Sequence, residues 1–170
     1  MIEYRDARPE DGAALAKMAA ESFIETFGHL YRREDLDAFL RDVFGPDGLP
    51  REICDPAYRT RIAIDDGAIA GFCKRGPCGL PTPPVPEGAA ELKQLYILRP
   101  WQGTGVAQAL MEWAIASARA DGARHMALSV YSDNHRAQRF YARYGFAEIG
   151  AHPFMVGEQM DDDRIWSLAL

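Results

Sequence analysis

The sequence lacks any apolar run of about 18 residues, the length that a membrane-spanning helix requires. Residues 1–6 also lack the basic segment followed by an apolar stretch that marks a secretory signal. These two absences predict a cytoplasmic protein that has no membrane as a partner.

Cysteine is scarce, and the number and spacing of the cysteines argue against complete disulfide pairing and against a zinc site. The chain has three cysteines, Cys54, Cys73 and Cys78, so they cannot all pair with one another. The one close spacing, Cys73-x4-Cys78, has no second pair to complete a zinc site. We therefore expect free thiols with a structural role, and no metal site.

The sequence also has no excess of positive charge. Its 19 Lys and Arg residues face 25 Asp and Glu residues, which gives a formal net charge of -6. Nucleic-acid-binding domains are usually basic. The charge balance therefore argues against a nucleic acid as the partner and favours a cationic small molecule.

The apolar pattern that is present predicts one domain, residues 1–170, with mixed secondary structure. Apolar spacing indicates the order strand, two helices, three strands, helix, strand, helix and two strands. The expected helices are 11–27, 33–44, 106–120 and 134–144, and the expected strands are 2–5, 59–64, 68–74, 91–98, 125–131, 146–149 and 164–170. The proline-rich residues 76–88 should form a surface loop, because proline lacks the amide that a central strand needs.

The most informative stretch, residues 91–120, is expected to form a strand, a tight turn and a helix. Gly103 and Gly105 would let the turn bring its N–H groups close to a ligand. The first turn of the following helix has unpaired N–H groups and the positive end of the helix dipole, so a pyrophosphate fits there. A dinucleotide fingerprint would need glycine where Gln108 stands, and the Gly-Lys-Ser/Thr of a P-loop is absent. A glycine pair can also simply begin a helix, and this motif alone leaves that alternative open.

Two motifs carry a family resemblance. Gln102-x-x-Gly105-x-Ala107 resembles the Gln/Arg-x-x-Gly-x-Gly/Ala signature of the GNAT superfamily of acyl-CoA-dependent N-acetyltransferases. Residues 134–146 resemble the Asn-x-x-Ala-x-x-Phe-Tyr-x-x-x-Gly-Phe motif that follows the fifth strand in that family. The two motifs occur in the family's order, separated by an expected helix and strand.

A weaker resemblance points within the family. Phe23-x-x-Thr26-Phe27, residues 91–97 and Val156-Gly157-Glu158 are similar to segments of the PaiA-type polyamine acetyltransferases. This likeness suggests polyamines as acceptors.

The GNAT resemblance implies an α/β (α+β) fold. Its central sheet would be mixed but mostly antiparallel, with a splay between the fourth and fifth strands and helices on both faces. The resemblance further implies acetyl-CoA as cosubstrate, lying in that splay. The expected cofactor-binding residues are Leu95, Tyr96 and Ile97 for the pantetheine, Gln102, Gly103, Thr104, Gly105, Val106 and Ala107 for the pyrophosphate, and Asn134 and Phe140.

The resemblance also implies direct attack of an amine on the thioester. Tyr141 would protonate the departing thiolate, since a phenol with a pKa near 10 suits that role; the alternative is a tyrosine that merely packs. An alkyl ammonium must lose a proton before it attacks. Glu91, at the start of the central strand, is the expected base, and an exposed strand-end carboxylate is the competing interpretation. The acceptor would lie over the first two helices.

Three functions follow as hypotheses. The leading one is acetyl transfer to a primary amine of a small molecule, with polyamines as candidates. The second is acetylation of a protein N-terminus or lysine, and the third is a sensor that binds acyl-CoA without turnover. Asn134 and Tyr141 favour catalysis over the sensor. A homodimer is expected from the family alone.

Overall fold

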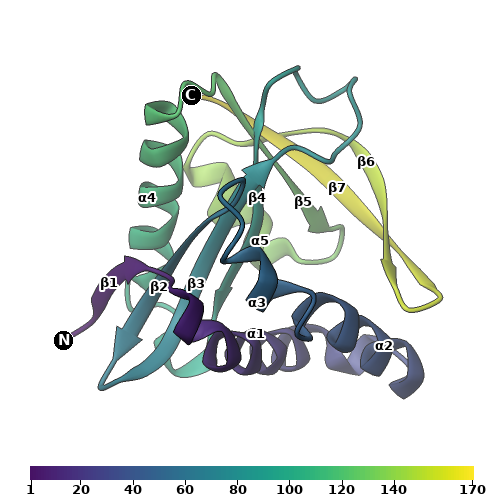
Figure 1. Ribbon diagram of the computed structural model, residues 1–170. Helices are drawn as coiled ribbons and strands as arrows, with labels where there is room; N and C mark the ends of the chain where they lie inside the picture. The colour runs from purple at the N-terminus through teal and green to yellow at the C-terminus, as the bar shows by residue number, and fades with distance from the viewer.

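The computed structural model describes residues 1–170, in which one seven-stranded sheet carries helices on both faces (Figure 1). The strands are β1 Glu3–Asp6, β2 Arg59–Asp65, β3 Ala68–Pro77, β4 Ala90–Ile97, β5 His125–Tyr131, β6 Ala147–Val156 and β7 Gln159–Ala169. The α-helices are α1 Gly12–Phe27, α2 Arg33–Phe44, α3 Leu49–Glu52, α4 Val106–Ala120 and α5 His135–Arg143. Three 3-10 helices are η1 Pro9–Asp11, η2 Gly28–Leu30 and η3 Arg99–Trp101. The expected order of elements is confirmed, and α3 lies within residues 49–54, which the sequence allows to form one further turn or a short helix.

The sheet is mixed, and its single parallel pair is the one that opens. In the order β1-β2-β3-β4-β5-β7-β6, only β4 and β5 run parallel. They pair at two positions, Ala90 with Met126 and Glu91 with Ala127. Strand β4 meanwhile stays paired with β3 as far as Ile97. The expected splay is therefore present, and it leaves the β5 side of residues 92–97 without a strand partner.

A β-bulge lies where the splay begins. Strand β3 pairs Lys74 with Gln94 and Arg75 with Leu92, so Lys93 is an extra residue in β4. A bulge bends its strand and increases the local twist. This bend helps to turn β4 away from β5.

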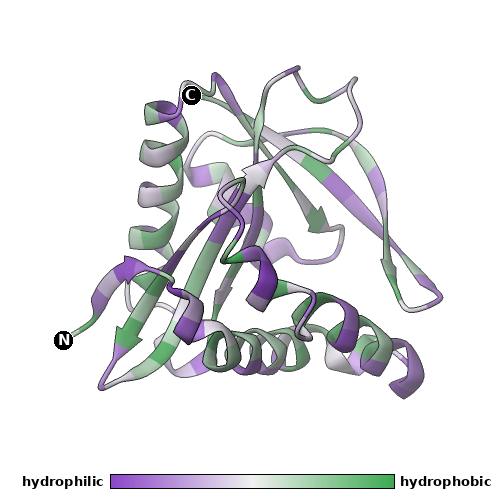
Figure 2. Ribbon diagram, in the orientation of Figure 1, coloured by the Kyte–Doolittle hydropathy of each residue, from purple (hydrophilic) through white to green (hydrophobic).

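The two faces of the sheet bury separate hydrophobic cores, because successive strand residues point to opposite faces. Ala63 and Cys73 pack with α4, whereas their neighbours Ile62 and Phe72 pack with α1 and α2. Figure 2 shows the apolar colour along the central strands and α1. No helix in the structure is long and apolar enough to cross a bilayer.

Three boundaries differ from the sequence expectation. Gly76 and Pro77 end β3 instead of opening a loop, and the exposed, terminal Pro77 is a position where a missing amide is tolerated. The remaining loop is partly buried, since Leu80 and Val85 pack against β5 and β7. Strands β6 and β7 are both longer than expected, and β7 begins at Gln159, five residues before Arg164.

Candidate active site

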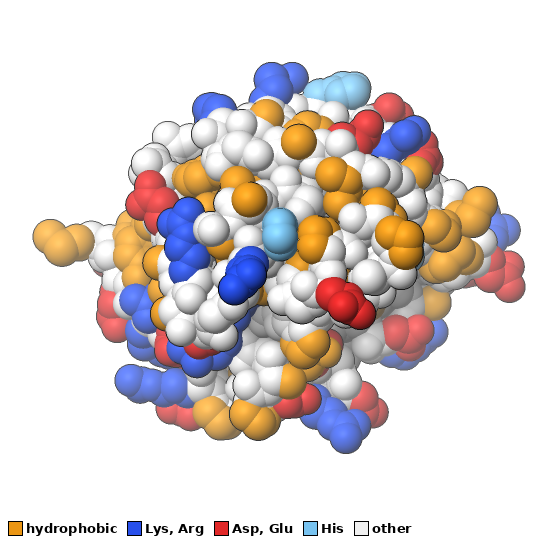
Figure 3. Space-filling model, turned by 90° about the horizontal axis from the view of Figure 1, so that it is seen from above, with side chains coloured by type: hydrophobic (Ala, Val, Ile, Leu, Met, Phe, Trp, Pro, Cys, Tyr) orange, Lys and Arg blue, Asp and Glu red, His pale blue; other side chains and the backbone are white.

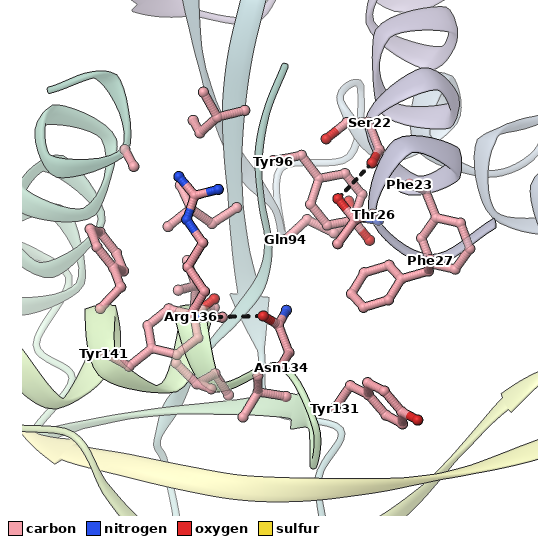
Figure 4. Close-up of a pocket in the computed structure, with 18 of the residues that line it drawn as sticks. Ser22, Phe23, Thr26, Phe27, Gln94, Tyr96, Tyr131, Asn134, Arg136 and Tyr141 are labelled. Atoms are coloured by element: carbon pink, nitrogen blue, oxygen red, sulfur yellow. Dashed lines mark hydrogen bonds between the residues drawn. The ribbon is translucent and has the colours of Figure 1, made fainter. Parts of the chain in front are cut away.

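A cleft of about 830 Å³ runs through the splay between β4 and β5 (Figure 4). Its walls come from α1, β4, the turn before α4, β5, α5 and β7. In Figure 4, Arg136 and Tyr141 of α5 lie to one side of β4, and Ser22, Phe23 and Phe27 of α1 lie to the other. The cleft therefore connects the two faces of the sheet.

The glycine turn opens onto this cleft. Gly103 and Gly105 have φ angles of 79° and 93°, in the left-handed region that glycine adopts readily. Nothing lies within 4 Å of the position of a Cβ at either residue. Gly105 is the N-cap of α4, and no side chain caps this helix. The turn can thus present backbone amides and the positive helix end to an anion.

Gln102 connects the turn to its neighbours. Its Nε2 donates a hydrogen bond to the carbonyl of Ile97 at 3.0 Å, and its Oε1 accepts one from Arg136. The arginines that line the cleft are Arg99, Arg136, Arg139 and Arg143. This end of the cleft is therefore basic in a protein whose net charge is -6.

Most of the expected cofactor residues come together here. The cleft is lined by Leu95, Tyr96, Ile97, Gln102, Gly103, Gly105, Ala107, Asn134 and Phe140. Thr104 and Val106 are not among the lining residues. The hydroxyl of Thr104 donates to the carbonyl of Trp101 at 2.6 Å, and Val106 is 1% exposed in the core. The side chain of Val106 is therefore a packing group, and only its backbone could serve a ligand.

Asn134 and Tyr141 flank the same part of the cleft (Figure 4). Asn134 is the N-cap of α5, and its Oδ1 accepts a hydrogen bond from the amide of Ala137 at 3.2 Å. This cap leaves its NH₂ group available to a ligand. Burial, and then the nearby Cys73, raise the pKa of Tyr141 above its ordinary value. The phenol therefore stays protonated, as a proton donor must.

The structure does not bring Glu91 into the cleft. Its Oε2 accepts hydrogen bonds from the amide of Gly79 at 2.9 Å and from Lys93 at 2.6 Å. The physical reason is its position: Glu91 lies where β4 and β5 still pair, before the splay opens. The ammonium group of the bulge residue Lys93 forms an ion pair with this carboxylate.

Two carboxylates that sequence reasoning missed do line the cleft. Asp161 and Asp163 of β7 are 7% and 6% exposed. Side-chain alternation turns them inward with Ile165, while Asp162 faces solvent. The run of three aspartates shows no alternation in the sequence, so no local signal distinguishes the two inward carboxylates from Asp162. Neither inward carboxylate forms an ion pair with a Lys or Arg.

The two aspartates have different partners. Asp161 accepts hydrogen bonds from the hydroxyl of Tyr31 and from the Nε2 of Gln159, the latter at 3.0 Å. Oδ2 of Asp163 accepts one from the hydroxyl of Ser129 at 2.9 Å. Burial raises the pKa of Asp163 to about 6, with Asp161 adding to the rise and the Ser129 hydrogen bond opposing it. Burial and the bond to Asp161 also raise the pKa of Tyr31.

This fold, with a splayed parallel pair, a glycine turn and a cleft between them, is that of an acyltransferase domain of the GNAT type. The acetyltransferase (GNAT) family matches residues 14–146, and the chain belongs to that family of N-acetyltransferases. The resemblance read from the two sequence motifs is thereby confirmed.

Individual relatives agree with this assignment. An uncharacterized N-acetyltransferase of Mycobacterium tuberculosis is 31% identical over 157 residues, which cover 91% of this chain and 95% of the relative. The spermidine N(1)-acetyltransferase of Thermoplasma acidophilum is 24% identical over 145 residues, covering 85% of this chain and 88% of that protein. The PaiA N-acetyltransferase of Thermoplasma acidophilum, solved in complex with coenzyme A, superposes with a TM-score of 0.80 at 21% identity over 100% of this chain and 99% of that one. This last likeness concerns the fold alone.

Proposed function

We propose that this protein transfers the acetyl group of acetyl-CoA to a primary amine of a small molecule by direct attack. The observation that carries the proposal is the continuous cleft through the splay. One end has a glycine turn and arginines, suited to phosphates, and the other end has two buried carboxylates, suited to a cation. Tyr141 lines the same cleft.

The free edge of β4 suits the pantetheine arm. Residues 92–97 have no β5 partner, so their backbone groups on that side can pair with the amides of an extended ligand, as in strand addition. The pyrophosphate would then reach the turn at Gly103 and Gly105, with Gln102 and Arg136 beside it. The NH₂ group of Asn134 would bond the pantetheine, and Phe140 would contact the arm from α5.

The reaction that follows is an aminolysis of the thioester. The neutral amine attacks the carbonyl carbon, the C–N bond forms, and the C–S bond breaks as the intermediate collapses. The departing sulfur takes the proton of Tyr141, and the new amide nitrogen returns a proton to the phenolate. The raised pKa of Tyr141 keeps this proton in place until the thiolate forms.

The acceptor end of the cleft favours a small amine over a protein chain. It is enclosed by Phe23 and Phe27 of α1, by Tyr31 after that helix, and by Phe154 of β6. One relative is named for a small amine as its acceptor, the spermidine acetyltransferase, which supports polyamines as candidates.

Tyr141→Phe tests the catalytic role. Turnover should fall roughly 10²-fold or more because the leaving thiolate loses its acid, while the affinity for acetyl-CoA stays the same. The matched control is Tyr144→Phe, because Tyr144 is half-buried near the end of the same helix but does not line the cleft. Thiol release measures turnover, and calorimetry measures affinity. Equal turnover of Tyr141→Phe and the wild type would remove the acid role.

The same assay separates the alternatives. A panel of small amines, N-terminal peptides and lysine peptides shows which acceptor class supports thiol release. Binding of coenzyme A with no thiol release on any acceptor would favour the sensor. Release on peptides alone would favour the protein acetyltransferase.

A further inference from the structure

We propose that Asp161, Asp163 and Gln94 form the subsite for the acceptor. In this subsite Asp163 accepts the proton of the reacting ammonium, and Asp161 holds a second positive charge on the same molecule. The acceptor class is therefore an aliphatic amine with a second cationic nitrogen. This inference rests on the acetyltransferase function proposed above and deepens it.

Gln94 provides an independent sign that a donor binds here. Its side chain is 9% exposed and lines the cleft, and its Oε1 is buried without a hydrogen-bond partner. An unpaired buried acceptor costs free energy, which a ligand N–H group would recover. Figure 4 shows Gln94 on β4 beside Tyr96 and facing α1, next to the splay. We therefore assign Gln94 to the reacting nitrogen.

Asp163 has the geometry of a proton acceptor. Only its Oδ2 is engaged, by Ser129 at 2.9 Å, so Oδ1 can take a proton. Burial raises the pKa of Asp163 to about 6, which leaves it anionic at neutral pH and able to titrate. The titratable side chains around it are Tyr31, Tyr96, Tyr131, His152, Asp161 and Asp162.

The proton and bond changes balance. One ammonium proton moves to Asp163, which exposes the nitrogen lone pair, and the amine then attacks the acetyl carbon. Sulfur leaves with the proton of Tyr141, and the second nitrogen proton restores Tyr141. Asp163 then releases its proton to solvent, so the products are the amide, free coenzyme A and one proton.

The carboxylate of Asp161 is suited to binding a positively charged group of the ligand. The Tyr31 hydroxyl and the Gln159 amide both donate to it, and such donors stabilise a carboxylate. No Lys or Arg neutralises it, so a cation must come from the ligand. In the same cleft, the rings of Phe27 and Tyr131, with centroids 6.3 Å apart, offer an apolar wall to the alkyl chain of the ligand.

The test compares three substitutions that remove the same charge from one strand. They are Asp161→Asn, Asp163→Asn and the control Asp162→Asn, whose side chain faces solvent. The probes are n-butylamine with one charge and 1,4-diaminobutane with two. Thiol release gives KM and kcat, and calorimetry with 1,4-diaminobutane alone gives binding without turnover.

Asp161→Asn should raise KM for 1,4-diaminobutane about tenfold or more and barely change KM for n-butylamine. Asp163→Asn should lower kcat for both amines roughly 10²-fold and remove the acidic limb of the pH profile of kcat/KM, near about pH 6. Asp162→Asn should match the wild type in both parameters. Thermal unfolding and acetyl-CoA binding should show that all three variants fold and bind the cosubstrate.

Each role can be overturned separately. If Asp161→Asn and Asp162→Asn have the same KM for 1,4-diaminobutane, Asp161 does not hold a second charge. If Asp163→Asn keeps the wild-type kcat and acidic limb, Asp163 is not the proton acceptor. Absence of thiol release by the wild type on every amine would instead refute the proposed function. Calorimetry would still decide the subsite, since 1,4-diaminobutane should bind Asp161→Asn about tenfold more weakly than the wild type.

Discussion

At the scale of single residues, the buried carboxylate of Asp163 destabilises the protein while no ligand is bound. Its pKa is raised from 3.8 to about 6 in the folded state, so the folded state binds the proton more tightly than the unfolded chain does. The free energy of unfolding therefore falls as pH rises from about 4 to 6, and the penalty is complete above this window.

Asp163→Asn should remove this penalty. At about pH 7.5 the melting temperature of the free protein should rise by roughly 5 °C, and at about pH 3 it should change little, because Asp163 is then largely protonated in both states. Thermal denaturation at the two pH values measures the difference. Asp162→Asn, which removes a solvent-facing charge, serves as control. The interpretation fails if Asp163→Asn has the same effect at both pH values.

Gly105 should matter for ligand binding as well as for backbone conformation. Its φ of 93° disfavours a Cβ, and Gly122, after α4, has a similar φ of 88° with equally open surroundings. Alanine at either position should cost about 1–2 kcal/mol of stability. Only Gly105→Ala should weaken coenzyme A binding, by about tenfold, because its methyl group would stand where the pyrophosphate meets the turn. Calorimetry with both variants measures this, and equal affinities would exclude Gly105 from the phosphate site.

At the scale of elements, sequence reasoning succeeded where the signal is local. The apolar periods of α1 and α4, and the chemistry of Gly103 and Gly105, depend on neighbouring residues only. These local signals were sufficient to predict the order of the elements and the glycine turn. The resemblance carried by residues 134–146 supplied the positions of Asn134 and Tyr141, which do line the cleft.

The first half of β7 could not be predicted in this way. Three consecutive acids, Asp161 to Asp163, show no apolar alternation, and they form a strand because β6 and β5 pair with them. The environment of Glu91 likewise depends on residues that are distant in the sequence. Whether it faces the cleft depends on where β5 stops pairing and on the bulge at Lys93.

Helix α5 should become more ordered when coenzyme A binds. None of its residues is fully buried, and Ala137, Phe140 and Tyr141 pack against the core only in part, whereas α4 fully buries six residues. A sparsely packed helix opens locally at low cost, and a ligand that contacts Asn134 and Phe140 stabilises its closed form. Hydrogen exchange of α5 amides should slow by about tenfold or more with coenzyme A, and exchange in the interior of α4, the internal control, should change little. Equal slowing in both helices would indicate a global effect instead.

At the scale of the whole molecule, the cleft has arginines on α5 and two buried aspartates on β7, whereas charges of both signs are mixed on the surface outside it. The face in Figure 3 has acidic and basic side chains interspersed, with no continuous basic surface. Within the cleft, Arg136 bonds Gln102 of the turn, and Asp161 and Asp163 stand on β7. The net charge of -6 repels an anionic ligand at long range, so local arginines must supply the attraction for coenzyme A. If the acceptor is cationic, as proposed, the aspartates on β7 would attract it and would repel the phosphates of acetyl-CoA from that part of the cleft.

This arrangement predicts that removal of arginines from the cleft weakens the binding of coenzyme A but not the binding of the amine. Replacing Arg139 and Arg143 together by alanine should weaken coenzyme A binding about fivefold at about 50 mM NaCl, because partly exposed charges each contribute modestly. The difference between variant and wild type should shrink at about 500 mM NaCl, where the Debye length is only a few ångströms. Binding of 1,4-diaminobutane should be unaffected by the same variant. Arg51→Ala removes an exposed positive charge on α3, outside the cleft, and should leave both affinities unchanged. Calorimetric titrations at the two salt concentrations measure the affinity of each protein for both ligands. A loss of coenzyme A affinity that is independent of salt would show that the two arginines act by packing and not by charge.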